Sequence, residues 1–185
     1  MDSKNDIKTN VMRLLDGKKI AYTPHYYDGA VSGSEICAAL GQDPHRVFKT
    51  LVTVGKSGTH YVFVVPVAGE LDLKKAAKAV GEKSVEMIKS KDLLPLTGYI
   101  HGGCSPIGMK KFFTTVVDGS GQDFDTIMFS AGEIGYQDQM PRAALQKMIR
   151  QTLAELTWRR FLIAQPLIFR CRRLKSAETN CRAFG

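Results

Sequence analysis

Lys49 is the charged residue whose position in the sequence points most directly to chemistry. It lies in the run Val47-Phe48-Lys49-Thr50-Leu51, whose composition is typical of a β-strand. Alternation along a strand places Val47, Lys49 and Leu51 on one face, so the lysine must extend to the rim or project into a cleft. Two interpretations stay open: a functional ammonium group, or a charge that protects an edge strand from aggregation.

A glycine-rich loop over residues 102–108, Gly-Gly-Cys-Ser-Pro-Ile-Gly, is the second candidate. Gly102 and Gly103 would let the backbone approach a ligand closely, with amide groups available for a carbonyl or carboxylate oxygen. Ser105 could add a hydroxyl group, and Pro106 would restrict the turn. The loop has neither the Walker A nor the dinucleotide pattern, so we expect no nucleotide cofactor. A plain tight turn is the alternative interpretation.

Cys104 within this loop raises the question of a nucleophile, because a thiolate needs a nearby base or cation to activate it. His101 is close in sequence, but nothing in the pattern places its ring on the sulfur, and we interpret Cys104 as a small, partly buried thiol. The other histidines show no metal-ligand spacing and the carboxylates are dispersed. We therefore predict neither a metal site nor a hydrolase with paired carboxylates. The four cysteines form no CxxC pair, and we expect free thiols.

The elements that must position these residues indicate an α+β fold with a mixed or mainly antiparallel sheet. Periodicity and capping residues predict helices over residues 8–19, 32–41, 71–80, 90–94 and 141–156. β-rich runs predict strands over residues 20–27, 47–54, 61–67, 85–87, 113–118 and 126–130. The second and third of these strands form a predicted hairpin around a turn at residues 55–58. Because Pro24 interrupts the first strand, it is expected at a sheet edge.

The positive charge of the chain is concentrated at its C-terminal end. Of the formal net charge of +8, residues 158–185 contribute +6, from seven Lys or Arg and one Glu, which leaves +2 for residues 1–157. The near-neutral body does not by itself indicate RNA binding. We divide the chain into a domain over residues 1–157 and a basic extension over residues 158–185. Three interpretations of the extension stay open: a disordered tail, an arm that contacts RNA phosphates, or a sequence altered by a shifted reading frame.

The general composition is that of a cytoplasmic protein. A chain of 185 residues with 44% hydrophobic side chains can bury one core of ordinary size. No run approaches the roughly 20 apolar residues that span a bilayer. The first residues lack the apolar segment and cleavage site of a signal peptide, so we predict a soluble protein with no membrane partner.

Several of these motifs together resemble the YbaK/EbsC family of single-domain deacylases, which are related to the editing domain of bacterial prolyl-tRNA synthetases. The similarity extends over about residues 7–156, and the combination of motifs in order is more specific than any one of them. Its most specific parts are Val47-Phe48-Lys49-Thr50-Leu51, the run Pro66-Val67-Ala68-Gly69-Glu70-Leu71-Asp72-Leu73-Lys74-Lys75, Thr97-Gly98-Tyr99, and Gly102-Gly103-Cys104-Ser105-Pro106-Ile107-Gly108-Met109-Lys110-Lys111. The LDLKK and GGxSPxGxKK patterns are similar to those of the branch that removes cysteine from Cys-tRNA(Pro).

The resemblance implies a fold and a site. The fold would be a mixed, strongly curved, β-barrel-like sheet with flanking helices. Lys49 would correspond to the family's indispensable lysine. Gly102, Gly103, Ser105 and Pro106 would line the pocket for the aminoacyl ester, and Tyr27 would occupy the place of a pocket tyrosine.

The resemblance also implies a reaction that needs no protein nucleophile and no cofactor. The thiol of the substrate would attack its own ester carbonyl, releasing the tRNA 3′ end and a cyclic thiolactone. Well-held geometry can supply about 7–11 kcal/mol of such a barrier. Lys49 would position the substrate and neutralise charge, while the amides of Gly102 and Gly103 would hold the developing oxyanion. The implied partners are the acceptor end of an aminoacyl-tRNA and prolyl-tRNA synthetase.

Two departures from the family pattern stand beside this resemblance. Cys104 occupies a position where an aliphatic residue is expected. The segment Ala131-Gly132-Glu133-Ile134-Gly135 replaces a loop expected to carry Lys and Arg, which removes a basic contact to tRNA. Two alternatives remain open at this stage: a deacylase of alanyl- or seryl-tRNA that uses water, and a non-catalytic module that binds tRNA or a synthetase.

Overall fold

The computed structural model describes residues 8–28 and 32–158, which form five α-helices, one 3₁₀ helix and eight strands in two sheets. The helices are α1 (Asn10–Gly17), α2 (Gly33–Leu40), α3 (Leu73–Val80), α4 (Ser90–Thr97), α5 (Arg142–Met148) and the 3₁₀ helix η2 (Gly119–Asp123). The strands are β1 (Thr23–Tyr26), β2 (Phe48–Gly55), β3 (His60–Pro66), β4 (Val85–Met87), β5 (Thr114–Asp118), β6 (Thr126–Ser130), β7 (Tyr136–Pro141) and β8 (Gln151–Ala154). The architecture is α+β, as expected.

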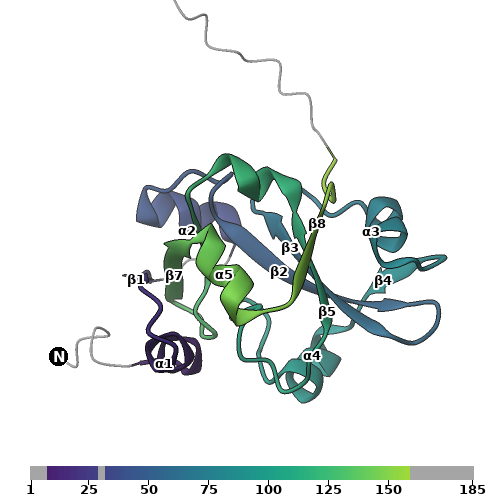
Figure 1. Cartoon of the computed structure of the whole chain (residues 1–185), viewed down its shortest axis with the longest axis horizontal. Coiled ribbons are helices and arrows are strands. Elements are labelled where there is room, and N and C mark those ends of the chain that lie inside the picture. Colours follow the sequence, from purple (N-terminus) through teal and green to yellow (C-terminus); the bar gives the residue numbers. More distant parts are fainter. Residues whose placement is uncertain (1–7, 29–31, 159–185) are drawn as a thin grey trace, which may run out of the picture.

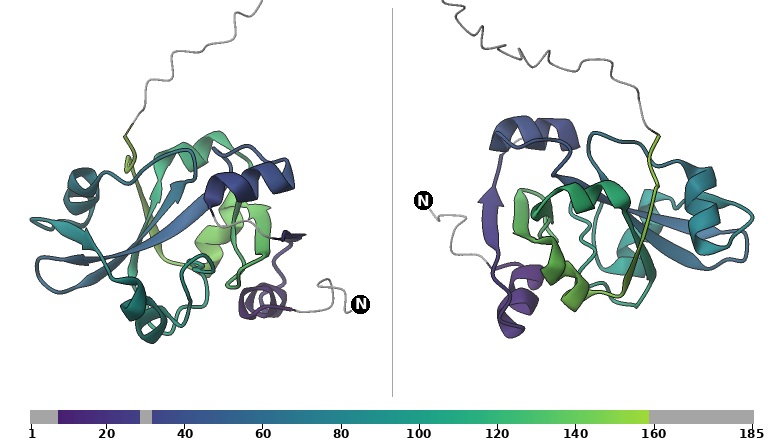
Figure 2. Two further views of the ribbon diagram at one scale, coloured as in Figure 1. Left: turned by 180° about the vertical axis from the view of Figure 1, so that it is seen from behind. Right: turned by 45° about the horizontal axis from the view of Figure 1, so that its top comes forward.

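A five-stranded sheet in the order β4-β2-β3-β5-β8 forms the larger unit. The β2–β3 hairpin and the β2–β4 pair are antiparallel, whereas β5 pairs in parallel with both β3 and β8. The predicted hairpin and the predicted mixed sheet are therefore confirmed. α3 and β4 lie at one end of the long axis of the molecule, and α1, β1 and α2 lie at the other (Figures 1 and 2).

The two faces of this sheet carry separate hydrophobic clusters. Phe48 and Val52 of β2 belong to the larger cluster, which also contains Val62 and Val64 of β3 and residues from α1 and the glycine-rich loop. Phe63 belongs to a second cluster on the opposite face, where Leu51 packs against it and α3 contributes Ala76 and Ala77. This separation follows from the period of two along each strand.

Local sequence accounts for the ends of the helices. Ser32 caps α2 in a reciprocal capping box with Glu35, and Gly41 ends that helix in the left-handed conformation. Asp72 caps α3 by accepting hydrogen bonds from the backbone of Lys74 and Lys75. These are the helices whose boundaries the sequence predicted most closely.

The smaller sheet, in the order β1-β7-β6, overturns the expectation of a strongly curved, barrel-like sheet. Within residues 8–28 and 32–158, neither sheet closes on itself. The two sheets meet at an isolated bridge between Val47 and Met128, next to a backbone hydrogen bond from Met128 to Arg46. The strand β7 pairs on both sides within its own sheet, with β1 and with β6, and this pairing keeps the two sheets distinct.

The region after residue 130 differs most from the sequence-based expectation. The predicted helix over residues 141–156 is confirmed for Arg142–Met148 and wrong beyond it, because α5 ends at Met148 and the chain continues as β8. The strand β7 was not predicted, although β1 pairs with it along an edge as Pro24 indicated. β8 completes the larger sheet through long-range parallel pairing with β5, an interaction that overrides local helix propensity.

Asp118 fastens the end of β8 to the end of β5. Its carboxylate is buried and accepts hydrogen bonds from the backbone amides of Leu156, at 2.8 Å, and Thr157, at 3.1 Å. The other carboxylate oxygen accepts from the amide of Ser120 at 3.0 Å, which fixes the start of η2.

Most of the proposed extension, residues 159–185, lies outside the described residues. No helix within the described ranges is long and apolar enough to cross a membrane.

We predict that Asp118→Ala lowers the free energy of unfolding by about 2–4 kcal/mol, because the buried amides of this network would lose their charged acceptor. Urea unfolding followed by circular dichroism would measure the loss. Asp123→Ala, which removes an exposed carboxylate on the same connection, serves as the control and should change stability by less than about 0.5 kcal/mol. Equal effects of the two substitutions would contradict this role for Asp118.

Candidate functional site

Lys49 projects from β2 on the face that carries α3. It pairs with Val65 of β3, and its ammonium group contacts the carboxylate of Glu70 at 3.0 Å. The lysine side chain is 28% exposed, whereas that of Glu70 is 82% exposed. β3 pairs with β2 along Lys49, whereas β4 pairs only with residues 53–55, so the edge-strand interpretation of Lys49 stays open beside the functional one. The partly buried ammonium group of Lys49 therefore pairs with an exposed carboxylate. Because an exposed ion pair contributes little free energy, water or an anionic ligand can displace the Glu70 carboxylate at little cost.

The glycine-rich loop begins with a tight turn. The amide of Gly103 donates to the carbonyl of Ile100 at 3.1 Å, and Gly102 between them has a φ of 84°. A positive φ at this position of a turn favours glycine, which explains Gly102. The expectation that the Gly103 amide binds an oxyanion is wrong for this conformation, because that amide already has an acceptor inside the turn.

Gly103 has a different role, which is to let two loops approach each other. A Cβ atom at this position would lie 3.2 Å from the backbone of Glu133 and Ile134. Contacts this short are tighter than side chains normally tolerate, and here the neighbour is backbone, which cannot rotate away. The pair Gly102-Gly103 therefore docks the glycine-rich loop on the segment 131–135, the segment that departs from the family pattern.

Ser105 and Pro106 stabilise the remainder of the loop. Ser105 is fully buried, and its hydroxyl accepts the amide of Ile107 at 3.3 Å. The carbonyl of Ile107 in turn accepts the hydroxyl of Tyr99 at 2.6 Å. Pro106 is buried and contributes to the wall of a groove that continues along the chain. In this conformation the Ser105 hydroxyl is a structural acceptor that closes the turn.

Tyr27 also reaches the segment 131–135. Its amide donates to the carbonyl of Gly135 at 3.0 Å, and its side chain is only 6% exposed. Neighbouring Tyr26 instead contacts Tyr136 edge to face, with ring centroids 5.3 Å apart. The structure thus gathers Tyr27, Gly102 and Gly103 around one segment. Lys49 lies on the face of β2 opposite to Phe48, whose cluster contains Cys104 of the glycine-rich loop.

Cys104 packs in the large hydrophobic cluster, and burial raises the pKa of its thiol to about 12. The thiol therefore stays protonated near neutral pH, which agrees with its interpretation as a structural residue rather than a nucleophile. Cys37 is likewise a buried free thiol, while Cys171 and Cys181 lie outside the described residues. Within the described ranges, no three His, Cys, Asp or Glu side chains gather closely enough to hold a metal ion.

Asp138 is a buried carboxyl that the sequence analysis missed. It lies on β7, is fully buried, and neither of its oxygens has a hydrogen-bond partner among the described residues. Burial, assisted by the charge of Asp16, raises the pKa of Asp138 to about 7. The alternation of Tyr136, Asp138 and Met140 could have revealed it, because the two flanking residues are apolar and share its face. Its burial makes it a pH-sensitive element of the smaller sheet.

Solved structures with the same arrangement of elements define the class of fold. A crystal structure titled as that of a putative trans-editing enzyme for prolyl tRNA synthetase matches with a TM-score of 0.71 and 22% identity, covering 80% of this chain and 94% of the other. The crystal structure of a hypothetical protein also gives a TM-score of 0.71, at 18% identity, covering 80% of this chain and 99% of the other. At these identities the matches establish the fold alone.

Sequence comparison adds the family. Residues 28–148 match the aminoacyl-tRNA editing domain, so the chain belongs to this family, and the resemblance to YbaK/EbsC proteins is confirmed. The curated protein "Putative Cys-tRNA(Pro)/Cys-tRNA(Cys) deacylase EbsC" of Enterococcus faecalis (strain ATCC 700802 / V583) is 43% identical over 157 residues. That similarity covers 83% of this chain and 96% of the relative.

Asp138 leads to a prediction about the pH dependence of stability. Its pKa is raised from 3.8 to about 7 in the folded protein, so between these values the folded state holds a proton that the unfolded state has released. Stability must then fall as pH rises through this window, by up to about 1.4 kcal/mol per pH unit, and level off above it. Asp138→Asn removes this dependence.

We therefore expect the stability of Asp138→Asn, measured relative to wild type by urea unfolding, to increase by about 2–3 kcal/mol between pH 5 and pH 8. Asp125→Asn, an exposed carboxylate near the same sheet, is the control and should track wild type at both values. If the curves of Asp138→Asn and wild type run parallel across this range, the carboxyl is not protonated in the folded protein.

Proposed function

We propose that this protein is a trans-editing hydrolase that deacylates mischarged aminoacyl-tRNA, with Cys-tRNA(Pro) as its substrate. The observation that carries the proposal is the 43% identity, over most of both chains, to the relative named as a deacylase of Cys-tRNA(Pro) and Cys-tRNA(Cys). Membership of the aminoacyl-tRNA editing family and the presence of Lys49 support the same class of reaction.

Lys49 is the proposed catalytic residue. Its ammonium group is held by one strand at a defined register and neutralised by an exposed partner, Glu70, so a phosphate or ribose oxygen at the tRNA 3′ end can take the place of the carboxylate. A fixed cation stabilises negative charge that develops on the ester as it breaks, and no reorganisation is needed at that moment.

The remaining predicted residues position the glycine-rich loop in this proposal, and that loop packs with the face of β2 opposite to Lys49. Gly102 and Gly103 hold the glycine-rich loop against residues 131–135, and Ser105 and Pro106 keep the loop in one conformation. Tyr27 donates its amide to Gly135 at the end of the same segment. Because the Gly103 amide is engaged within the turn, oxyanion stabilisation is assigned to Lys49 rather than to Gly103.

The proposed reaction uses the thiol of the substrate. The cysteinyl sulfur attacks its own ester carbonyl, the bond to the ribose oxygen breaks, and the tRNA 3′ hydroxyl leaves with a proton while a cyclic thiolactone forms. Orientation of the substrate is then the main requirement. The buried, protonated Cys104 offers no competing nucleophile. Pocket size alone discriminates between side chains by about 1–3 kcal/mol per methylene group. A reaction that requires the thiol of the substrate discriminates against alanine more strongly, because alanine has no thiol. Prolyl-tRNA synthetase is the proposed partner that presents the tRNA.

Hydrolysis of tRNA(Pro) charged with cysteine, compared with the same tRNA charged with alanine, tests the function. We expect rapid loss of cysteine and retention of alanine by the purified full-length protein. Loss of both amino acids would replace the thiol mechanism by attack of water. Absence of hydrolysis in either case, with or without prolyl-tRNA synthetase, would favour a non-catalytic binding module.

For the site itself, Lys49→Ala should lower kcat for Cys-tRNA(Pro) by about 10²–10³-fold without unfolding the protein, because a charge that stabilises the transition state is removed. Lys56→Ala, in the exposed turn of the same hairpin, and Cys104→Ala should both retain most activity. Full activity of Lys49→Ala would disprove the proposed site, and an inactive Cys104→Ala that remains folded would disprove the substrate-thiol mechanism.

A further inference from the structure

A groove of about 930 Å³ follows directly from the glycine-rich loop. One wall consists of residues between Pro106 and Thr115, which lead from that loop into β5. The other wall consists of residues 146–152, at the end of α5 and the start of β8. The groove exists because α5 stops at Met148 and the chain turns into β8. It is therefore a product of the same long-range pairing that ends the helix.

The charge of the groove is of one sign. Lys111, Lys147 and Arg150 lie in its walls, and none of its lining residues is acidic. Residues 1–157 carry a formal charge of only +2 in total, so without these three cations the remainder of this part of the chain would carry −1. A groove lined by one sign of charge attracts an anionic ligand and holds it by several phosphate contacts.

Phe112 adds an aromatic surface to the same groove. Its side chain is fully exposed, at 108% of the reference value, and its neighbour Lys111 is also exposed. Because the ring of Phe112 is fully exposed, it contributes no hydrophobic burial to folding. Its whole surface is available to a binding partner. Met109, Phe113 and Met148 provide further apolar surface in the lining.

We propose that this groove binds unpaired nucleotides of the tRNA acceptor end, with one base stacked on Phe112 and the phosphates on Lys111, Lys147 and Arg150. An aromatic platform flanked by cations is the arrangement that recognises single-stranded nucleic acid without reading its sequence. Pro106 belongs both to the groove and to the glycine-rich loop, so a strand bound in the groove lies next to that loop. This inference rests on the proposed function for the identity of the RNA.

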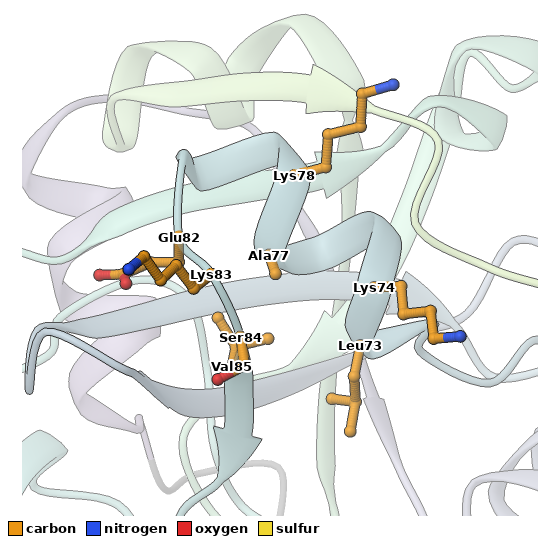
Figure 3. A pocket seen from close by; sticks show the side chains of 8 residues that line it. All are labelled: Leu73, Lys74, Ala77, Lys78, Glu82, Lys83, Ser84 and Val85. Carbon is orange, nitrogen blue, oxygen red and sulfur yellow. The ribbon is translucent and has the colours of Figure 1, made fainter.

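A second basic surface provides a matched control. Lys74, Lys78 and Lys83 surround a smaller depression of about 400 Å³ between α3 and β4. Figure 3 shows Lys74 and Lys78 extending outward from the helix, while Glu82 lies beside Lys83. This surface has the same number of cations as the groove, but it includes a carboxylate and no aromatic side chain. It separates the effect of general positive charge from that of the groove.

Binding of fluorescently labelled, uncharged tRNA(Pro) to the full-length protein, measured by anisotropy over a salt series, tests the proposal. Phe112→Ala should weaken binding by about 5- to 150-fold, whereas Phe112→Tyr should restore it. The triple variant Lys111→Ala, Lys147→Ala and Arg150→Ala should reduce the slope of log K against log salt by about 2. The control triple variant at Lys74, Lys78 and Lys83 should change the slope less.

Each other outcome contradicts the proposal in a recognisable way. Equal slopes for the two triple variants would show that only general charge matters, and unchanged affinity of Phe112→Ala would remove the stacking contact. If Phe112→Ala instead changed the mass measured by light scattering and left tRNA affinity intact, the groove would be a self-association surface. If its effect required added prolyl-tRNA synthetase, the groove would bind that protein.

The Cys-tRNA(Pro) assay distinguishes this inference from the proposed function. If the groove binds the tRNA, Phe112→Ala raises KM for Cys-tRNA(Pro). The same substitution leaves kcat within about threefold of wild type, because the phenylalanine ring lies outside the reacting centre. A wild-type protein that hydrolyses Cys-tRNA(Pro) with no effect of the groove variants would overturn only the groove assignment. A wild-type protein that binds tRNA through the groove but hydrolyses no ester would overturn only the proposed function.

Discussion

The strand β3 imposes the constraint on which the rest of the structure depends. Every residue from Tyr61 to Pro66 is buried, so both faces of this strand need a hydrophobic cover. The helix α3 covers one face, and α1 with the glycine-rich loop contributes to the cover of the other. The antiparallel register between β3 and β2 determines which residues of β2 lie on each face of the sheet. A shift of one residue would move every β2 side chain to the other face. In the observed register Lys49 lies opposite Val65, on the face that carries α3.

In the glycine-rich loop, backbone groups that could bind a substrate are already used to maintain the fold. Gly103 accommodates the backbone of Glu133 and Ile134, and its amide closes the turn to Ile100. An amide that closes the turn is not available to a substrate oxygen in the same conformation.

The distribution of charge matters more than its total. A pI near 9.4 describes the whole chain, although most of the excess positive charge lies after Thr157. Within residues 8–28 and 32–158, lysine and arginine side chains attract an anion most strongly where several of them lie on one surface. Lys111 lies far along the sequence from Lys147 and Arg150, and the turn from α5 into β8 brings the two segments to one groove beside Phe112. A charge count along the sequence dilutes such a cluster with carboxylates that lie elsewhere.

The sequence by itself determined the local elements and the family. Capping residues such as Ser32 and Asp72, the glycines that end α2 and α3, and the alternating β2–β3 hairpin act over a few residues, so their effects are readable without tertiary information. The motifs around Lys49 and residues 102–108 indicated the family for the same reason. Tertiary structure decided the division into two sheets, the conversion of residues 151–154 into β8, the burial of Asp138 and the close approach of Gly103 to the backbone of residues 133–134. Each of these depends on pairing or burial between residues distant in sequence, where the free energy of long-range contacts outweighs local propensity.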